Sequence, residues 1–146
     1  MKRILTALLF SLLGCSVADA EITEKQTANY IIKGNNITMC YFPEIWSASS
    51  QEERTKILQN WVDDPDKSHL ALIYDSLYYP LLVDSFGEEN AERVMKRELD
   101  LSPYLAKIST EKKNKTTVKT NKDCQALWEE VKHLITTYHY YEVSAE

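Results

Sequence analysis

Two cysteines set the strongest constraint on how this chain of 146 residues can fold. Cys40 and Cys124 lie 84 residues apart, and the third cysteine, Cys15, belongs to an N-terminal segment with the features of an export signal. An even pair of cysteines in an oxidising compartment is expected to form a disulfide. Closing so long a loop would stabilise the fold by about 4 to 5 kcal/mol in the chain-entropy model. We therefore expect Cys40 and Cys124 to tie the first helix of the mature chain to the last.

The first twenty residues have the layout of a secretory signal peptide. Lys2 and Arg3 form a basic start, an apolar stretch follows, and Ala-Asp-Ala at 18–20 is the small-x-small pattern at which a signal peptidase cleaves. The sequence therefore predicts a signal peptide over 1–20 and a single mature domain over 21–146, in a periplasm or outside the cell.

A lipoprotein signal overlaps this segment. Leu-Leu-Gly-Cys at 12–15 resembles a bacterial lipobox, in which the cysteine, here Cys15, is lipidated and becomes the new N-terminus. The alternative is therefore an outer-membrane lipoprotein, and contact with a membrane is expected only if Cys15 is lipidated. No apolar run reaches the length of about 18 residues that a membrane-spanning helix needs.

Composition excludes several classes of protein. Charged residues make up 27% of the chain and hydrophobic residues 44%, which is typical of a globular domain and not of a disordered one. Three glycines are too few for a glycine-rich nucleotide loop. The net charge of -5 argues against nucleic acid as the main partner.

Apolar residues recur at helical spacing along most of the chain, and no alternating strand pattern of useful length occurs. A capping box of Ser50 and Glu53 predicts one helix start, and Asp123 is expected to cap the last helix. Helices are expected over 21–42, 50–62, 69–79, 90–99, 102–108 and 124–141, with a break or bend at Pro80. We expect an all-α fold, a small bundle of five or six helices stapled by one disulfide.

The stretch 109–122 differs from the rest of the chain. It is rich in threonine, asparagine and lysine, and Val118 is the single apolar residue within it. We expect a basic, flexible loop there, beside a strongly acidic helical body. Five lysines stand against the single acid Glu111: Lys112, Lys113, Lys115, Lys119 and Lys122.

Catalytic and metal-binding motifs are not found in the sequence. His69, His133 and His139 have no partner at the i, i+4 spacing of a helical zinc site, and there is no Cys-x-x-Cys pair or Gly-x-Ser-x-Gly elbow. The cluster Asp63, Asp64 and Asp66 lacks the glycine and distal glutamate of a calcium loop, and one of its acids is expected to cap the next helix. We expect no enzymatic activity, no metal and no cofactor.

Aromatic and acidic residues are the candidates for binding a protein partner. Trp61 and Trp128 lie on apolar helical stripes and are expected in the core, whereas Trp46 follows Pro43 in a predicted loop. Exposed aromatics beside acids are typical of protein interfaces. The candidate set is Trp46, Asp63, Asp64, Asp66, Tyr140 and Tyr141.

Two segments carry a resemblance to a known family. They are Tyr-Ile-Ile-Lys-Gly-Asn-Asn-Ile-Thr-Met-Cys at 30–40 and Lys-Asp-Cys-Gln-Ala-Leu at 122–127. With the export signal and the acidic helical domain, they resemble the periplasmic immunity proteins of type VI secretion amidase effectors. The resemblance implies a stoichiometric inhibitor of a secreted amidase or another cell-wall hydrolase, with no catalytic residue of its own.

A second family shares this layout. Type II secretion pilotins are similar small, disulfide-stapled helical lipoproteins that bind a secretin segment, and the lipobox ending at Cys15 supports that alternative. A groove between helices would then hold an amphipathic partner helix. A homodimer and an exported helical domain of another role are further alternatives.

Overall fold

The computed structural model describes residues 21–139. The expectations for the signal peptide at 1–20, for Cys15, and for Tyr140 and Tyr141 lie outside the described residues.

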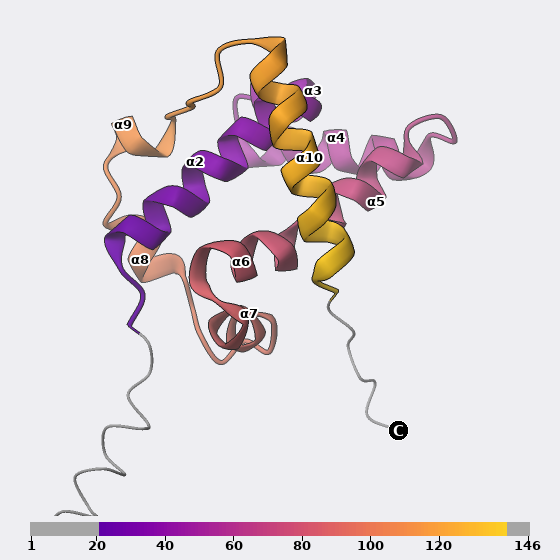
Figure 1. The fold of residues 1–146 in the computed structure, drawn as a ribbon. Helices are drawn as coiled ribbons and strands as arrows, with labels where there is room; N and C mark the ends of the chain where they lie inside the picture. The colour runs from indigo at the N-terminus through magenta and orange to yellow at the C-terminus, as the bar shows by residue number, and fades with distance from the viewer. Residues whose placement is uncertain (1–20, 140–146) are drawn as a thin grey trace, which may run out of the picture.

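The described part of the chain is built from helices joined by short connections, without a strand (Figure 1). The helices are α2 (Glu24–Tyr41), α3 (Pro43–Ser47), α4 (Gln51–Asp63), α5 (Ser68–Ser76), α6 (Tyr78–Phe86), α7 (Glu88–Met95), α8 (Ser102–Ala106), α9 (Thr110–Lys113) and α10 (Asn121–Thr137). Six of these described helices have eight residues or more, and α3, α8 and α9 are single short turns. The prediction of an all-α fold is confirmed.

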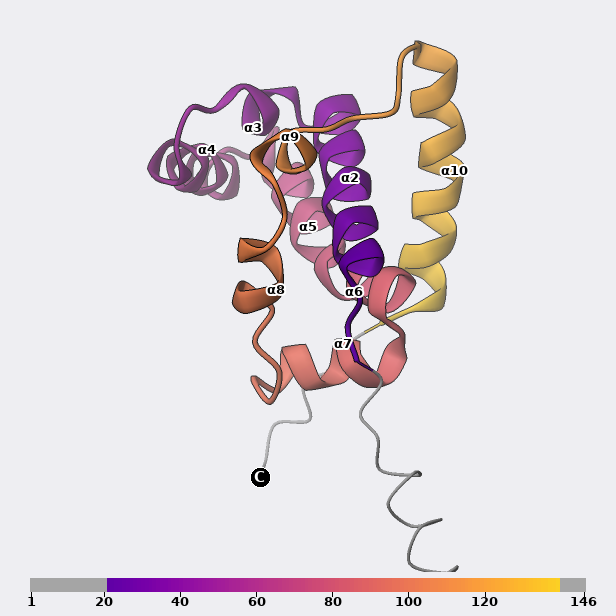
Figure 2. The same cartoon turned by 90° about the vertical axis from the view of Figure 1, so that its left-hand side faces the viewer.

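Helix α2 lies at the centre of the molecule. Helix α10 crosses it, α6 packs beneath both, and α7 lies against α6 at one end of the domain (Figure 1). Turning the molecule shows α8 and α9 along the flank of α2 that lies away from α10 (Figure 2). Helices α4 and α5 form a hairpin that projects from the body (Figure 1).

The disulfide between Cys40 and Cys124 is present, with a sulfur–sulfur distance of 2.07 Å. It joins the last turn of α2 to the first turn of α10, as predicted. Next to it the hydroxyl of Tyr41 donates a hydrogen bond to the carbonyl of Cys124, and the ring of Tyr41 packs on Trp128 at 4.8 Å between centroids.

The core consists of two apolar clusters. One gathers Ile37, Phe42, Ile45, Trp61, Leu77, Leu81, Leu127 and Val131, and the other gathers Ile22, Tyr79, Leu82, Val83, Phe86, Ala91 and Leu101. Tyr30 packs against both clusters. Each large apolar side chain removed from water contributes about 1.5 to 3 kcal/mol, so this burial is what holds the short helices together.

The prolines and the helix ends show why some boundaries were predictable. Pro43 ends α2 at Tyr41, as predicted, because the residue before a proline is pushed out of the helical region. The sequence predicts a helix break at Pro80, but the break lies three residues earlier. The chain leaves the helix at Leu77, and Pro80 sits in the first turn of α6, where its missing N–H costs no hydrogen bond.

Two predicted caps differ in detail. Ser50 accepts a hydrogen bond from the Glu53 N–H, but the Glu53 carboxylate bonds the backbone N–H and hydroxyl of Ser49 instead of closing the box on Ser50. Helix α10 is capped by Thr120 and not by Asp123. Asp123 lies in the first turn of the helix, where its carboxylate accepts a hydrogen bond from the Thr120 N–H. Helix α10 therefore begins at Asn121, three residues before the predicted start, and it ends at Thr137.

Candidate partner-binding surfaces

The acids Asp63, Asp64 and Asp66 lie together at the tip of the α4–α5 hairpin. The carboxylate of Asp64 accepts a hydrogen bond from the Asp66 N–H at 2.9 Å, and its backbone carbonyl accepts from Ser68 at the start of α5. The prediction that one of these acids caps α5 is wrong, because the N-cap position is Lys67 and no side chain bonds there. Asp64 closes the turn, and the carboxylates of Asp63 and Asp66 are displayed on the exposed tip.

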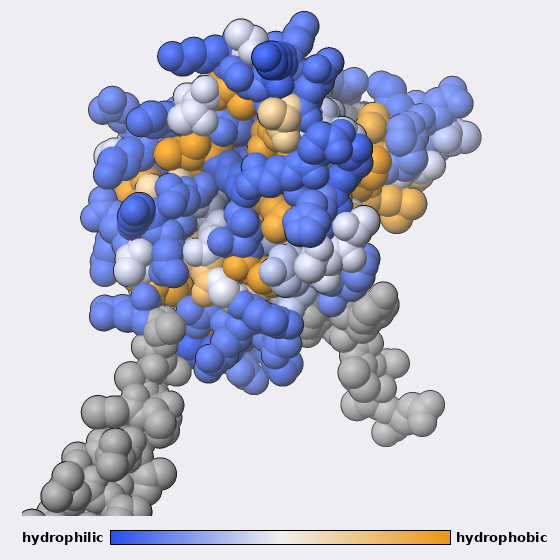
Figure 3. All heavy atoms as spheres, viewed as in Figure 1, coloured by the Kyte–Doolittle hydropathy of each residue, from blue (hydrophilic) through white to orange (hydrophobic). Residues whose placement is uncertain are grey.

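Two large apolar side chains are exposed on the same hairpin. Leu72 on α5 is 72% exposed and Val62 on α4 is 60% exposed. Figure 3 shows hydrophobic residues at the surface of the α4–α5 projection, beside hydrophilic ones. We call Val62, Asp63, Asp66 and Leu72 the hairpin surface, because this hairpin carries both exposed apolar side chains and exposed negative charge.

The hairpin is held to the body through Glu44 on α3. The indole N–H of Trp61 donates to one carboxylate oxygen of Glu44 at 3.2 Å, and the ammonium of Lys67 lies 3.3 Å from the other. Trp61 is buried, as predicted, and its ring packs on Phe42 at 6.0 Å between centroids. These contacts join the hairpin to α3, while Val62 and Leu72 stay exposed.

Trp46 does not lie in a loop. It belongs to the short helix α3 and is half-buried. Tyr140 and Tyr141 lie outside the described residues. Of the predicted binding residues, the structure thus places the three aspartates in the turn between α4 and α5 and Trp46 on α3.

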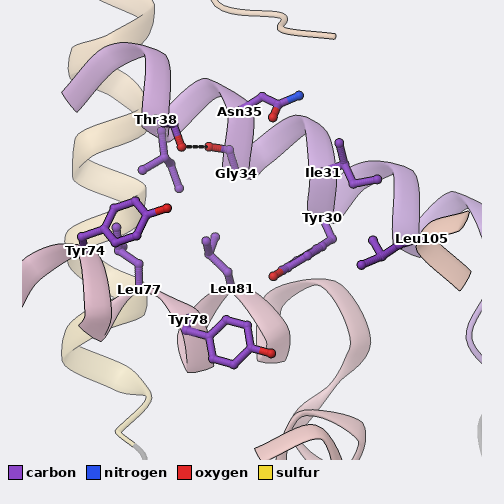
Figure 4. A pocket seen from close by; sticks show the side chains of 11 residues that line it. Tyr30, Ile31, Gly34, Asn35, Thr38, Tyr74, Leu77, Tyr78, Leu81 and Leu105 are labelled. Atoms are coloured by element: carbon purple, nitrogen blue, oxygen red, sulfur yellow. Dashed lines mark hydrogen bonds between the residues drawn. The ribbon is translucent and has the colours of Figure 1, made fainter. Parts of the chain in front are cut away.

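A second surface is an apolar groove of about 360 Å³ between α2, α5, α6 and α8. Figure 4 shows Tyr30 of α2 directed toward Leu81 and Tyr78 of α6, whereas the Asn35 side chain points away from the opening. We call this the tyrosine groove. Its lining is Tyr30, Ile31, Gly34, Asn35, Ile37, Thr38, Tyr74, Leu77, Tyr78, Leu81 and Leu105.

The tyrosines of this groove differ in their exposure. Burial raises the pKa of Tyr30 to about 12, with smaller contributions from the neighbouring Tyr78 and Tyr74. Tyr78 is 46% exposed and stands at the edge of the groove. Ile37, Leu77 and Leu81 are buried in its lining, so the groove has an apolar floor and an amphipathic edge, which suits an apolar side chain or the apolar face of a helix.

The three histidines do not form a shared centre. His69 and His133 are exposed on α5 and α10, and His139 lines a hollow of about 260 Å³ together with Asp75 and Ser76. The Ser76 hydroxyl donates to the Ile73 carbonyl at 2.8 Å. Among residues 21–139 no three histidine, cysteine, aspartate or glutamate side chains are placed to hold a metal ion.

Sequence reasoning missed Val62, Leu72 and the groove. Leu72 could have been found, because on a helical wheel it falls opposite the apolar face made by Leu70, Ile73, Tyr74 and Leu77. The groove could not have been found from the sequence, because its walls come from helices that are distant in the chain.

Within the described residues, no helix has the length and apolar character needed to cross a membrane. No protein family, curated protein or solved structure shows a significant match to this chain.

Proposed function

We propose that this chain is an exported binding protein that neutralises a secreted cell-wall hydrolase, most simply an amidase, by forming a complex with it. The predicted export signal supports the location, and the hairpin surface supports the mode of action. The observation that carries the proposal is the exposure of Leu72 and Val62 beside Asp63 and Asp66 on a projecting hairpin. Such an element fits the cleft of an enzyme better than a flat surface does.

The physical argument has two parts. An exposed leucine gains about 25 cal/mol for each Å² of apolar area that a partner removes from water. Carboxylates at the edge of an interface add little affinity but raise the association rate with a positively charged partner. Leu72 and Val62 would therefore supply the affinity, and the aspartates would favour a basic cleft over other surfaces.

The test is an inhibition assay with a secreted cell-wall amidase from the same organism and purified peptidoglycan as substrate. The wild-type protein is expected to abolish hydrolysis at a one-to-one ratio. A Leu72→Glu, Val62→Glu double variant is expected to weaken inhibition at least tenfold, because it places charge where the complex needs apolar contact.

The control is Ala126→Glu, which adds a carboxylate at an exposed position on α10 instead of on the hairpin. Circular dichroism checks that each variant keeps its helices. Inhibition that is unchanged in the hairpin variant, or no inhibition of any secreted hydrolase by the wild-type protein, would contradict the proposal.

The tyrosine groove favours a second candidate, a pilotin that holds an amphipathic secretin segment. Mass spectrometry of the mature N-terminus separates the two candidates, since Glu21 is expected for the inhibitor and an acylated Cys15 for the pilotin. A Leu105→Glu change in the groove lining is expected to abolish secretin binding and to leave hydrolase inhibition intact.

A further inference from the structure

The segment between α9 and α10 is not helical, and its sequence favours a strand. Residues 115–120 read Lys-Thr-Thr-Val-Lys-Thr, in which four of six residues are β-branched and suited to an extended backbone. The chain there runs stretched across α2 from α9 to the start of α10 (Figure 2). It is an isolated extended segment in a helical domain.

Two asparagines of α2 hold one edge of this segment. The side-chain amide of Asn35 donates to the carbonyls of Lys113 and Lys115, at 2.9 and 3.0 Å. Asn36, which is only 7% exposed, accepts from the Thr117 N–H at 2.8 Å and donates to the Thr117 hydroxyl at 2.9 Å. These amides take the place that a neighbouring strand would occupy in a sheet. The expected flexible loop at 109–122 thus contains the helix α9 and an anchored segment.

The opposite edge of the segment has no such partners. In an extended chain the backbone groups of residues i and i+2 face the same side, so those of Thr116 and Val118 face away from the bonds that Lys115 and Thr117 make to α2. Within residues 21–139, nothing bonds the backbone N–H or carbonyl of Thr116 or Val118. An unpaired row of this kind is a template for another strand.

The side chains of residues 115–119 place positive charge and an apolar contact site along this edge. Lys115 and Lys119 are exposed, whereas Thr116 and Val118 are half-buried, which is the alternation of a strand with one face on the body. Val118 also borders an open hollow of about 410 Å³ that is lined in part by Met39 and Cys124.

We propose that the free edge of residues 115–119 binds an extended segment of a partner protein by strand addition, and that this segment carries acidic side chains. Backbone hydrogen bonds to Thr116 and Val118 would provide the pairing. Carboxylates on the partner strand would lie opposite Lys115 and Lys119, and an apolar side chain would enter the hollow beside Val118.

A second copy of this chain fits the edge poorly. Antiparallel self-pairing about Thr117 would set Lys115 of one copy against Lys119 of the other, and like charges directly opposite each other destabilise a strand pair. Lysines on an edge strand are a common protection against such pairing. The same lysines that reject a second copy select an acidic strand. This proposal does not depend on the hairpin surface or on hydrolase inhibition.

The test uses the full mature chain labelled with ¹⁵N and a capped peptide of alternating glutamate and valine. The amide signals of Thr116 and Val118 are expected to shift on titration. The charge-reversal variant Lys115→Glu, Lys119→Glu is expected to weaken binding about tenfold or more. The variant Lys25→Glu, Lys107→Glu changes the net charge equally at exposed sites elsewhere and is expected to bind as the wild type does.

A peptide N-methylated at every residue cannot donate a backbone hydrogen bond from either edge, so it separates strand pairing from simple charge attraction, and it is expected not to shift these two amides. Equal shifts with the methylated peptide, or no shift with the unmodified one, would overturn the proposal. So would dimerisation of the wild type in light scattering, with Thr116 and Val118 protected from hydrogen exchange. Failure here would leave inhibition through Leu72 unaffected, so the two proposals fail separately.

Discussion

At the scale of single residues, a few polar side chains bridge helices that are far apart in sequence. The ammonium of Lys33 on α2 lies 2.6 Å from Asp84 on α6 and 2.5 Å from Glu130 on α10. Burial of this ammonium disfavours its charge, but the hydrogen bonds to the two carboxylates outweigh burial and raise the pKa of Lys33. Because the two carboxylates come from separate helices, Lys33 fixes their relative positions as well as its own.

Tyr30 gives the first prediction at this scale. Its phenol has a pKa of about 12 in the fold against 10.0 unperturbed, so the unfolded chain loses this proton first as the pH rises. The stabilising contribution is complete below pH 10 and is lost between pH 10 and about 12. The loss should reach about 2 to 3 kcal/mol at the upper end.

Urea unfolding at pH values from about 8 to about 12 measures this loss. Tyr30→Phe removes the ionisable hydroxyl and is expected to flatten the decline, leaving the smaller part that arises from Lys33 and Tyr41, whose pKa values are also raised. An equally steep decline in the phenylalanine variant would assign the alkaline sensitivity to other groups.

At the scale of elements, the ends of helices follow local chemistry only in part. Ser50 and Pro43 mark helix boundaries correctly, because a hydroxyl cap and a proline act on their immediate neighbours. The prediction that Asp123 caps α10 is wrong because Thr120, three residues earlier, completes the same motif one turn sooner. Gly34 weakens a helix but does not interrupt α2, which runs unbroken from Glu24 to Tyr41.

The two described glycines should respond oppositely to alanine. Gly34 lies mid-helix, and a methyl group added there would meet open space, so Gly34→Ala is expected to stabilise the protein by about 0.5 to 1 kcal/mol. Gly87 joins α6 to α7 with a φ of 86° and a ψ of 160°, a conformation that is almost restricted to glycine, so Gly87→Ala is expected to destabilise the protein by about 1 to 3 kcal/mol.

Thermal or urea unfolding of the two variants measures both effects, and each serves as the control for the other. If both substitutions changed the free energy of unfolding in the same direction, the backbone explanation would be contradicted. Gly34 also lines the tyrosine groove, so its alanine variant should narrow the groove without loss of stability.

At the scale of the whole molecule, the disulfide joins the first and last described helices across a loop of 84 residues. Reduction, or replacement of both cysteines by serine, is expected to lower the free energy of unfolding by about 2 to 5 kcal/mol. Urea unfolding with and without reductant measures the change. The Cys40→Ser, Cys124→Ser variant should be insensitive to reductant, and a wild-type protein of equal stability in both conditions would contradict the expectation.

The candidate surfaces are only partly accessible from the sequence. The acidic tip is predictable because Asp63, Asp64 and Asp66 are close together in the chain. The tyrosine groove is not, since Tyr30 and Tyr78 meet only after α2 packs on α6. The extended edge at 115–119 is hidden for the same reason, because the bonds that define it come from Asn35 and Asn36, some 80 residues earlier.

The sequence by itself determined the helical class, the cysteine pairing and the contrast between an acidic body and a basic segment. These depend on local periodicity, on the number of cysteines and on composition, which need no knowledge of what packs where. Only the tertiary structure decided which apolar residues remain exposed, where helices leave a groove, and which edge of residues 115–119 is free. Those properties arise from contacts between segments far apart in the chain, and such contacts are set by how the whole core closes.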